Sequence, residues 1–193
     1  MKVKFVSLTF LLLFTRACDF YSTGLWFFDN PTGEMNPLAS IFGFGWTGLL
    51  VSNAIIMALV IYAFYYYTFS YKTKTIKSKP GGLADFVSEL YFNEKGRFFD
   101  VFYKSPKNKK TLLAHTGYVL IRVIILGSIL ATFHNLCQFY QVGFYSSFRD
   151  FVGRPLFVIG GLVLLSFGYF AYRLWNREYQ IYKSNFVALD VHS

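Results

Sequence analysis

Ionisable and hydroxyl side chains recur at helical spacing in the N-terminal apolar segment. Asp19, Ser22 and Thr23 stand at positions i, i+3 and i+4, so a helix places them on one face. Ionisable groups inside a membrane helix are costly, and they mark ion or ligand sites by default. A carboxylate beside two hydroxyls can hold a cation, a proton or a lipid headgroup. The sequence therefore predicts a polar site in this segment.

Further polar side chains are expected near the same, outer side of the membrane. The candidate ligand-binding residues of the outer half are Asp19, Ser22, Thr23, Glu34, Asn36, Asn53, His134 and Asn135. Arg122 is a further candidate, expected near the midplane of the membrane. Two interpretations stay open. In the structural one, Asp19 pairs with Arg122 or Arg16, and the remaining groups hydrogen-bond between helices. In the functional one, Asp19 and Glu34 are the acidic groups of a site that is open to the outer side.

Patterns for catalysis and metal binding are weak. His134 and Cys137 are three residues apart, but no further His or Cys follows at metal-site spacing, so we expect no metal and no cofactor. Asp19 and Glu34 could act as acid and base, although their separation is not defined by the sequence. Cys18 and Cys137 are both expected on the outer side, where a disulfide depends on their geometry.

Composition indicates what kind of element carries these residues. The 193 residues are 54% hydrophobic and 15% charged, and the mean hydropathy is +0.39. Soluble domains are about 25% charged, so disorder, a disulfide-rich module and a typical soluble enzyme are excluded. Four stretches reach the roughly 20 residues that a membrane helix needs. They cover about residues 3–25, 46–71, 112–140 and 156–175. The predicted fold is all-α, a four-helix transmembrane bundle forming one integral membrane domain of residues 1–193. Small residues at spacings that favour close helix packing are Gly127, Ala131, Gly161 and Gly168.

Positive charge predicts the orientation. The net charge is +9, and residues 72–110 hold ten of the nineteen Lys and Arg residues. Because cytoplasmic loops carry such an excess, the basic loop 72–111 and both termini are predicted to be cytoplasmic, in a bacterial inner membrane. This rule already explains the lysines, so we expect no nucleic-acid partner. The first segment resembles a signal peptide, but Arg16 before Cys18 is atypical for cleavage, so we expect the segment to be retained.

The basic loop contains two amphipathic stretches. Apolar residues recur at helical spacing over 83–90, and aromatic residues alternate with charges over 97–104. Both stretches fit amphipathic interfacial helices between spans two and three, bound to anionic lipids at the cytoplasmic face. The alternative is a small cytoplasmic cap folded on itself. The tail from Glu178 onward is expected to be short and partly ordered at best.

A longer motif surrounds the first polar cluster. Asp19-Phe20-Tyr21-Ser22-Thr23, followed by Glu34-Met35-Asn36-Pro37, resembles the D-x-x-S-T … E-x-N-P hallmark of a family of small bacterial and archaeal membrane proteins of unknown function. The resemblance covers about residues 3–71. It implies a polytopic membrane protein in which Asp19, Thr23, Glu34, Asn36 and Pro37 act as a unit. It implies no reaction, and the long basic loop departs from the family pattern.

The sequence therefore predicts a non-enzymatic integral membrane protein. It is expected to bind a small cation or a lipid headgroup at the outer-side polar cluster, or to be a subunit of a homo-oligomer or membrane complex. One alternative is a membrane-embedded enzyme that acts on lipid through its paired carboxylates. Another is a small oligomeric transporter, although the two halves show no inverted repeat.

Overall fold

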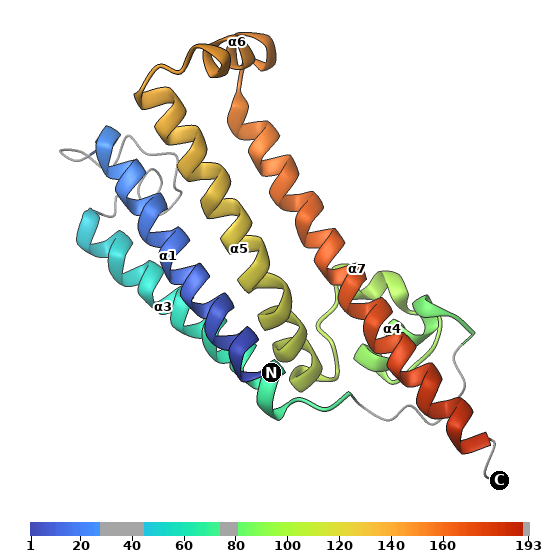
Figure 1. The fold of residues 1–193 in the computed structure, drawn as a ribbon. Helices are drawn as coiled ribbons and strands as arrows, with labels where there is room; N and C mark the ends of the chain where they lie inside the picture. Colours follow the sequence, from blue (N-terminus) through green and yellow to red (C-terminus); the bar gives the residue numbers. More distant parts are fainter. Residues whose placement is uncertain (28–44, 74–80, 191–193) are drawn as a thin grey trace.

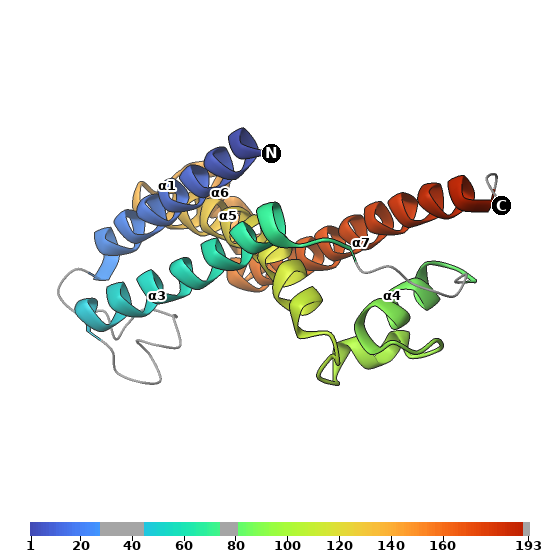
Figure 2. The same ribbon diagram turned by 90° about the horizontal axis from the view of Figure 1, so that it is seen from below.

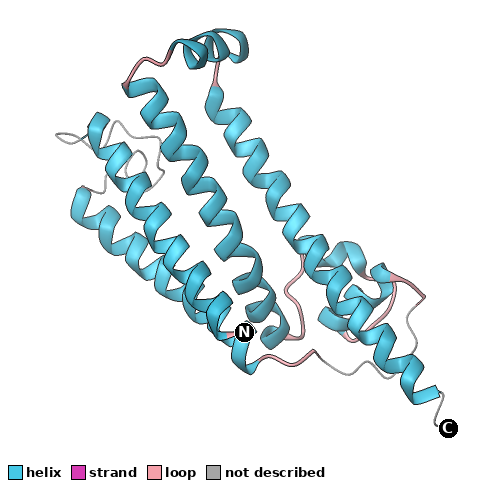
Figure 3. Ribbon diagram, in the orientation of Figure 1, coloured by secondary structure: helices cyan, strands magenta, loops and turns pink. Residues whose placement is uncertain are grey.

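The structure is a computed structural model that describes residues 1–27, 45–73 and 81–190. Within these residues the chain is helical and contains no strand, which confirms the predicted all-α class (Figure 3). The elements are α1 (Lys2–Phe27), α3 (Trp46–Tyr65), the π-helical turn η2 (Tyr66–Ser70), α4 (Leu83–Phe92), the 3₁₀ turn η3 (Phe98–Phe102), α5 (Lys109–Phe139), α6 (Gly143–Val152) and α7 (Pro155–Asp190).

Three helical segments are long and apolar enough to cross a membrane. They are Trp46–Ser70, which joins α3 and η2, Lys109–Phe139 in α5, and Pro155–Ser184 in α7. The first two agree closely with the predicted spans at 46–71 and 112–140. α1, which carries Arg16 and Asp19, is not among the three.

The last helix differs from its prediction. α7 continues without a break to Asp190, so the expectation of a short, partly ordered tail after Glu178 is wrong. Tyr179 and Tyr182 pack against Phe86 of α4, with ring centroids 5.4 and 5.5 Å apart. This contact with the basic loop gives the extension an apolar surface to bury, which a free tail would lack.

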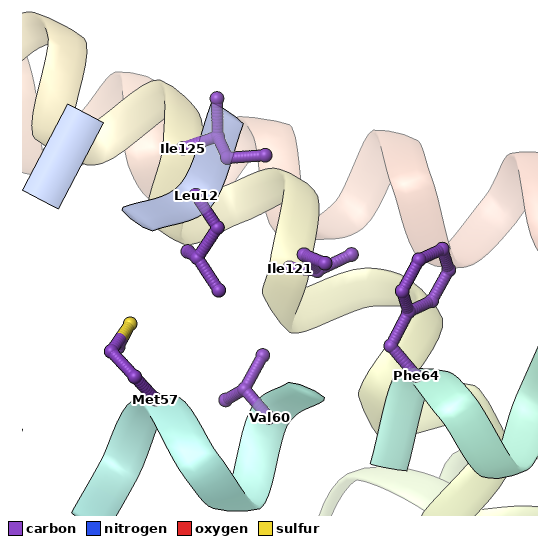
Figure 4. Packing of buried hydrophobic residues seen from close by; sticks show 6 residues of the cluster. All are labelled: Leu12, Met57, Val60, Phe64, Ile121 and Ile125. Carbon is purple, nitrogen blue, oxygen red and sulfur yellow. The ribbon is translucent and has the colours of Figure 1, made fainter. Parts of the chain in front are cut away.

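α5 is the central helix of the bundle. It contacts α1, α3 and α7, and α1 and α3 run beside it in both views (Figures 1 and 2). Six buried side chains from α1, α3 and α5 point toward one another between these helices (Figure 4). They are Leu12, Met57, Val60, Phe64, Ile121 and Ile125. A second cluster between α5 and α7 contains Tyr118, Val119, Val123, Ala171 and Leu174.

The closest helix contact is at Gly117 of α5. A Cβ atom there would lie 2.2 Å from the carbonyl carbon of Ala63 in α3, so only glycine fits. The small residues singled out from the sequence are less constrained. A Cβ on Gly127 would meet Val163 at an ordinary 3.5 Å, and within the described chain nothing lies within 4 Å of one on Gly161 or Gly168. Spacing alone therefore did not identify the position of closest approach.

The part of the basic loop from residue 81 to 108 packs against α7, and we call this part the cap. The apolar face of α4 is buried, with Phe86, Val87 and Leu90 packed against the aromatic side chains of the α7 extension. Residues 83–92 thus form a helix, as predicted, and α7 covers its apolar face. The second stretch forms one 3₁₀ turn, η3, in place of a longer amphipathic helix. The turn is held by the buried Asp100, which accepts hydrogen bonds from Tyr103 and Lys104.

Candidate functional site

Arg16 is the centre of the polar cluster in the first helix. Its Nη1 lies 2.5 Å from Oδ2 of Asp19, one turn further along α1, and 3.3 Å from Oγ of Ser128 on α5. Its Nη2 donates to Oδ1 of Asn53 on α3, and the Asn53 amide in turn donates to the carbonyl of Leu49 at 2.9 Å. One guanidinium therefore joins three helices.

This arrangement answers which cation pairs with Asp19. The two partners considered from the sequence were Arg122 and Arg16, and the structure places Arg16 against the carboxylate. The side chains of Asp19 and Arg16 are 14% and 21% exposed, so the pair is largely shielded from solvent. A carboxylate already neutralised at 2.5 Å has little remaining attraction for a free cation.

Asn135 connects the end of α1 to α5. Its amide nitrogen lies 3.2 Å from Oγ of Ser22 and 3.2 Å from Oγ1 of Thr23. Trp26 donates its indole N–H to the carbonyl oxygen of the same asparagine at 3.1 Å. The structure thus brings Asp19, Ser22, Thr23, Asn53 and Asn135 onto the α1–α3–α5 interface, as hydrogen-bonded contacts between helices.

The remaining outer-side candidates do not join this network in the described structure. His134 hydrogen-bonds through Nδ1 to the hydroxyl of the buried Tyr145 on α6, a helix that sequence analysis treated as a simple connection. Cys18 and Cys137 are both free thiols. Glu34 and Asn36, with the rest of the E-x-N-P motif, lie outside the described residues.

Arg122 lies in a different place, beside a cavity of about 230 Å³ at the end of the bundle where the chain begins. Residues of α1, of the continuous segment α3–η2, of α5 and of α7 line this cavity, which we call the basic cavity. The guanidinium carbon of Arg122 is 3.6 Å from the ring centroid of Tyr118. The corresponding carbon of Arg177 on α7 is 5.9 Å from the same centroid, and its Nη2 donates to the hydroxyl of Tyr67 at 2.6 Å.

Charge in the basic cavity is unbalanced. Lys4, Arg122 and Arg177 line it, whereas Glu178 is the one carboxylate among its described lining residues. Glu178 is 2% exposed and accepts a hydrogen bond from Thr73. Within the described residues none of the three cations forms an ion pair. The positive charges of Arg122 and Arg177 lie near the same aromatic ring and repel each other, so binding of an anion close to both is favoured.

The basic cavity could not be recognised from the sequence. In the sequence, Lys4 and Arg177 are charges near the ends of predicted spans, which the positive-inside rule explains, and Tyr67 is one of the aromatic residues that are common at span boundaries. The π-helical turn η2 is a local irregularity of the kind that is frequent at functional sites, and it carries Tyr67 to the cavity wall. The one signal available was Arg122, a lone arginine deep in an apolar span.

A second buried polar group attaches the cap to the bundle. His115 of α5 is buried, and its Nδ1 lies 2.7 Å from the hydroxyl of Tyr91 on α4. Trp175 of α7 donates its indole N–H to the same hydroxyl at 3.3 Å, so one hydroxyl links side chains of three helices. Burial raises the pKa of Tyr91 above its ordinary value of 10.0, which keeps this hydroxyl protonated. The contact fixes α4, α5 and α7 together.

Comparison with known proteins adds no family assignment. No protein-family model, no curated protein and no solved structure matches the chain. The functional interpretation therefore depends on the geometry of the two polar regions.

Proposed function

We propose that this chain is a multi-pass membrane protein that binds the phosphate of an anionic lipid headgroup in the basic cavity. The observation that carries the proposal is the pair Arg122 and Arg177, which flank one ring without a carboxylate partner among the described residues. Guanidinium groups match phosphate oxygens in charge and geometry. A volume of about 230 Å³ is smaller than the roughly 300–1,000 Å³ of drug-sized ligand sites, which suits a headgroup with its acyl chains outside.

The outer surface of the helices supports a lipid environment. Phe10 of α1 is 69% exposed and Leu164 of α7 is 72% exposed, and many large apolar side chains on the same helices are similar. Extended apolar surface of this kind marks contact with a membrane or a partner. α1 has 26 residues, a length of about 39 Å, and its exposed face is apolar. We therefore propose α1 as the fourth span of a four-helix transmembrane bundle.

The proposed orientation places the basic cavity at the cytoplasmic side of an inner membrane. Met1 lines the cavity, and the basic loop begins and ends at the same end of the bundle (Figure 1). The positive-inside rule assigns that end to the cytoplasm, where anionic lipids attract Lys and Arg.

Single cysteines test the orientation. Lys107 lies after η3 and Phe151 lies on α6, and both are exposed. In a background without Cys18 and Cys137, we expect an impermeant maleimide to label Phe151→Cys in intact cells. Lys107→Cys should react only after the membrane is opened. Labelling of both variants from one side would contradict the orientation.

The polar network around Arg16 and Asn135, which we call the outer-side cluster, has a structural role in this proposal. Asp19 and Thr23 belong to the motif shared with the family that the sequence resembles, and we propose that they fasten α1 to α3 and α5. Arg16 and Asn135 provide the partners. A cation site at Asp19, or an acid–base pair of Asp19 with Glu34, is less well supported because the Arg16 guanidinium already occupies the carboxylate.

Native mass spectrometry in mild detergent tests the lipid site. We expect the wild-type chain to retain phosphatidylglycerol in preference to phosphatidylcholine. Arg122→Gln with Arg177→Gln should reduce that retention at least tenfold, because two charge-assisted contacts are lost. Arg149→Gln on α6 is the matched control, since it removes one exposed positive charge at the other end of the bundle. Retention of inorganic phosphate without lipid would identify a free anion as the source, and equal retention of both lipids by all variants would exclude the site.

A further inference from the structure

The turn η3 displays an apolar ridge. Phe99 and Phe102 are 74% and 68% exposed, and positions three apart in a 3₁₀ helix lie one above the other. The rings of Phe99 and Phe102 both pack against the ring of Phe98, at centroid distances of 5.6 and 5.8 Å. Tyr103 follows directly and is also exposed. We call Phe99, Phe102 and Tyr103 the aromatic ridge.

The aromatic ridge is held in place by a buried carboxylate. Asp100 accepts a hydrogen bond from the Tyr103 hydroxyl at 2.6 Å and another from Lys104 Nζ at 3.0 Å. Arg97 Nε lies 3.8 Å from the same carboxylate. The turn therefore presents its phenyl rings outward from a fixed backbone.

The turn that carries the aromatic ridge lies beside Trp175 of α7. Phe98 packs edge-on against Trp175, with centroids 5.9 Å apart. Trp175 follows Pro155 by about 20 residues, or about 30 Å of helix, which is the thickness of a bilayer's hydrocarbon core. If α7 starts its crossing near Pro155, η3 lies where α7 leaves the hydrocarbon. Tryptophan and tyrosine are enriched at that boundary.

The surroundings of the ridge are positively charged. Four lysines follow within eight residues, at positions 104, 107, 109 and 110, and all four are exposed. The nearby acids are Glu94, which pairs with Lys107, and Asp100, which pairs with Lys104. Lysines therefore outnumber carboxylates around the ridge. Apolar rings bordered by lysines are complementary to an anionic headgroup layer.

We propose that the aromatic ridge inserts Phe99 and Phe102 into the cytoplasmic surface of an anionic bilayer, the one that α7 crosses. The cap is then fastened twice, to α7 through Trp175 and to lipid through the ridge. This surface is separate from the basic cavity, and its occupant is a layer of lipid rather than one bound molecule. The inference depends on α7 spanning the membrane as proposed above.

Fluorescence quenching in lipid vesicles tests the insertion. The full chain, without Cys18 and Cys137, is labelled with an environment-sensitive dye at Phe102→Cys and reconstituted with phosphatidylcholine and 30% phosphatidylglycerol. We expect a blue-shifted emission and at least twofold quenching by a nitroxide near the headgroup. Ala84→Cys, on the exposed side of α4, should show neither effect. Leu164→Cys, about midway between Pro155 and Trp175 on α7, should be quenched only by a nitroxide deep in the acyl chains.

Each contrary result has a distinct meaning. Water-like emission at position 102 with normal quenching at 164 would overturn the insertion and leave the membrane topology intact. No quenching at 164 would overturn both. Energy transfer between labels at 102 in place of lipid quenching would assign the ridge to a second copy of the chain. Equal quenching at 102 in pure phosphatidylcholine would overturn the requirement for anionic lipid.

Discussion

The guanidinium groups of Arg122 on α5 and Arg177 on α7 both lie near the ring of Tyr118. Their guanidinium carbons lie 3.6 and 5.9 Å from the centroid of that ring. A cation beside an aromatic face gains some stabilisation, which reduces the repulsion between the two charges. Arg122 donates through Nη1 to the carbonyl oxygen of Tyr118, and Arg177 donates through Nη2 to the hydroxyl of Tyr67. A guanidinium has five N–H donors, so each group keeps donors beyond these contacts. A phosphate group provides acceptors for those donors, and this relationship is the basis of the proposed lipid site.

Asp19→Asn tests whether the outer-side cluster fastens helices. The change removes the charge that neutralises Arg16 while keeping the shape of the side chain, so the free energy of unfolding should fall by about 1–3 kcal/mol. Reversible unfolding in mixed micelles measures it, and lipid retention at the basic cavity should be unchanged.

The matched control is Arg16→Gln combined with Asp19→Asn. Removing both charges leaves no unpaired ion, so the double variant should be more stable than the sum of the two single changes predicts. Simple additivity would show that the two side chains do not interact, and lost lipid binding in Asp19→Asn would show that the cluster belongs to the site.

Gly117→Ala tests the contact between α3 and α5. The new methyl group would overlap the backbone of Ala63, where the nearest carbon is only 2.2 Å away, so the helices must separate. We expect a loss of about 1–3 kcal/mol in the free energy of unfolding. Gly127→Ala is the control, because its methyl group would meet Val163 at 3.5 Å, and it should be neutral or slightly stabilising. Equal effects of the two changes would contradict this helix arrangement.

The sequence predicted the elements better than the site. Apolar runs of sufficient length predicted the membrane-length helices at about 46–71 and 112–140, because a helix that crosses a membrane needs such runs. The partner of Asp19 stays open in the sequence between Arg122 and Arg16, and only the structure identifies it as Arg16. α6 was missed because its ten residues lie in a segment that was treated as a connection between spans.

The basic cavity was beyond sequence reasoning for a different reason. Its walls come from four segments far apart in the chain, and the proximity of Lys4, Arg122 and Arg177 depends on how α1, α5 and α7 pack. Charges near helix ends have a sufficient explanation in membrane orientation, so nothing in their spacing indicated a shared ligand. The extension of α7 was missed similarly, because the contact with α4 that stabilises it is long-range.

The aromatic ridge should respond to acid through Asp100. Hydrogen bonds from Tyr103 and Lys104 hold the pKa of this carboxyl below its ordinary value of 3.8. A lowered pKa in the folded state means that the carboxylate stabilises η3 above pH 3.8, and that this contribution is lost as the pH falls through the lowered pKa. The protection of the amides of residues 97–104, measured by hydrogen exchange in nanodiscs relative to the intrinsic exchange rate at each pH, should therefore fall only below about pH 4.

Two variants isolate that effect. Asp100→Asn should exchange faster at neutral pH and lose the acid dependence. Glu94→Gln should keep it, although hydrogen bonding to Lys107 also lowers the pKa of Glu94 from 4.5. Unchanged acid dependence in Asp100→Asn would show that another group controls the turn.

The most direct measurement of the lipid site is the NMR signal of the arginine side chains themselves. With arginine labelled in nanodiscs, phosphatidylglycerol is titrated into phosphatidylcholine while the Nε–Hε resonances are followed. We predict that the resonances of Arg122 and Arg177 shift together and saturate, while that of Arg149 on α6 moves little. Resonances of Arg122 and Arg177 that do not respond, or a uniform shift of all three, would contradict a phosphate site in the basic cavity.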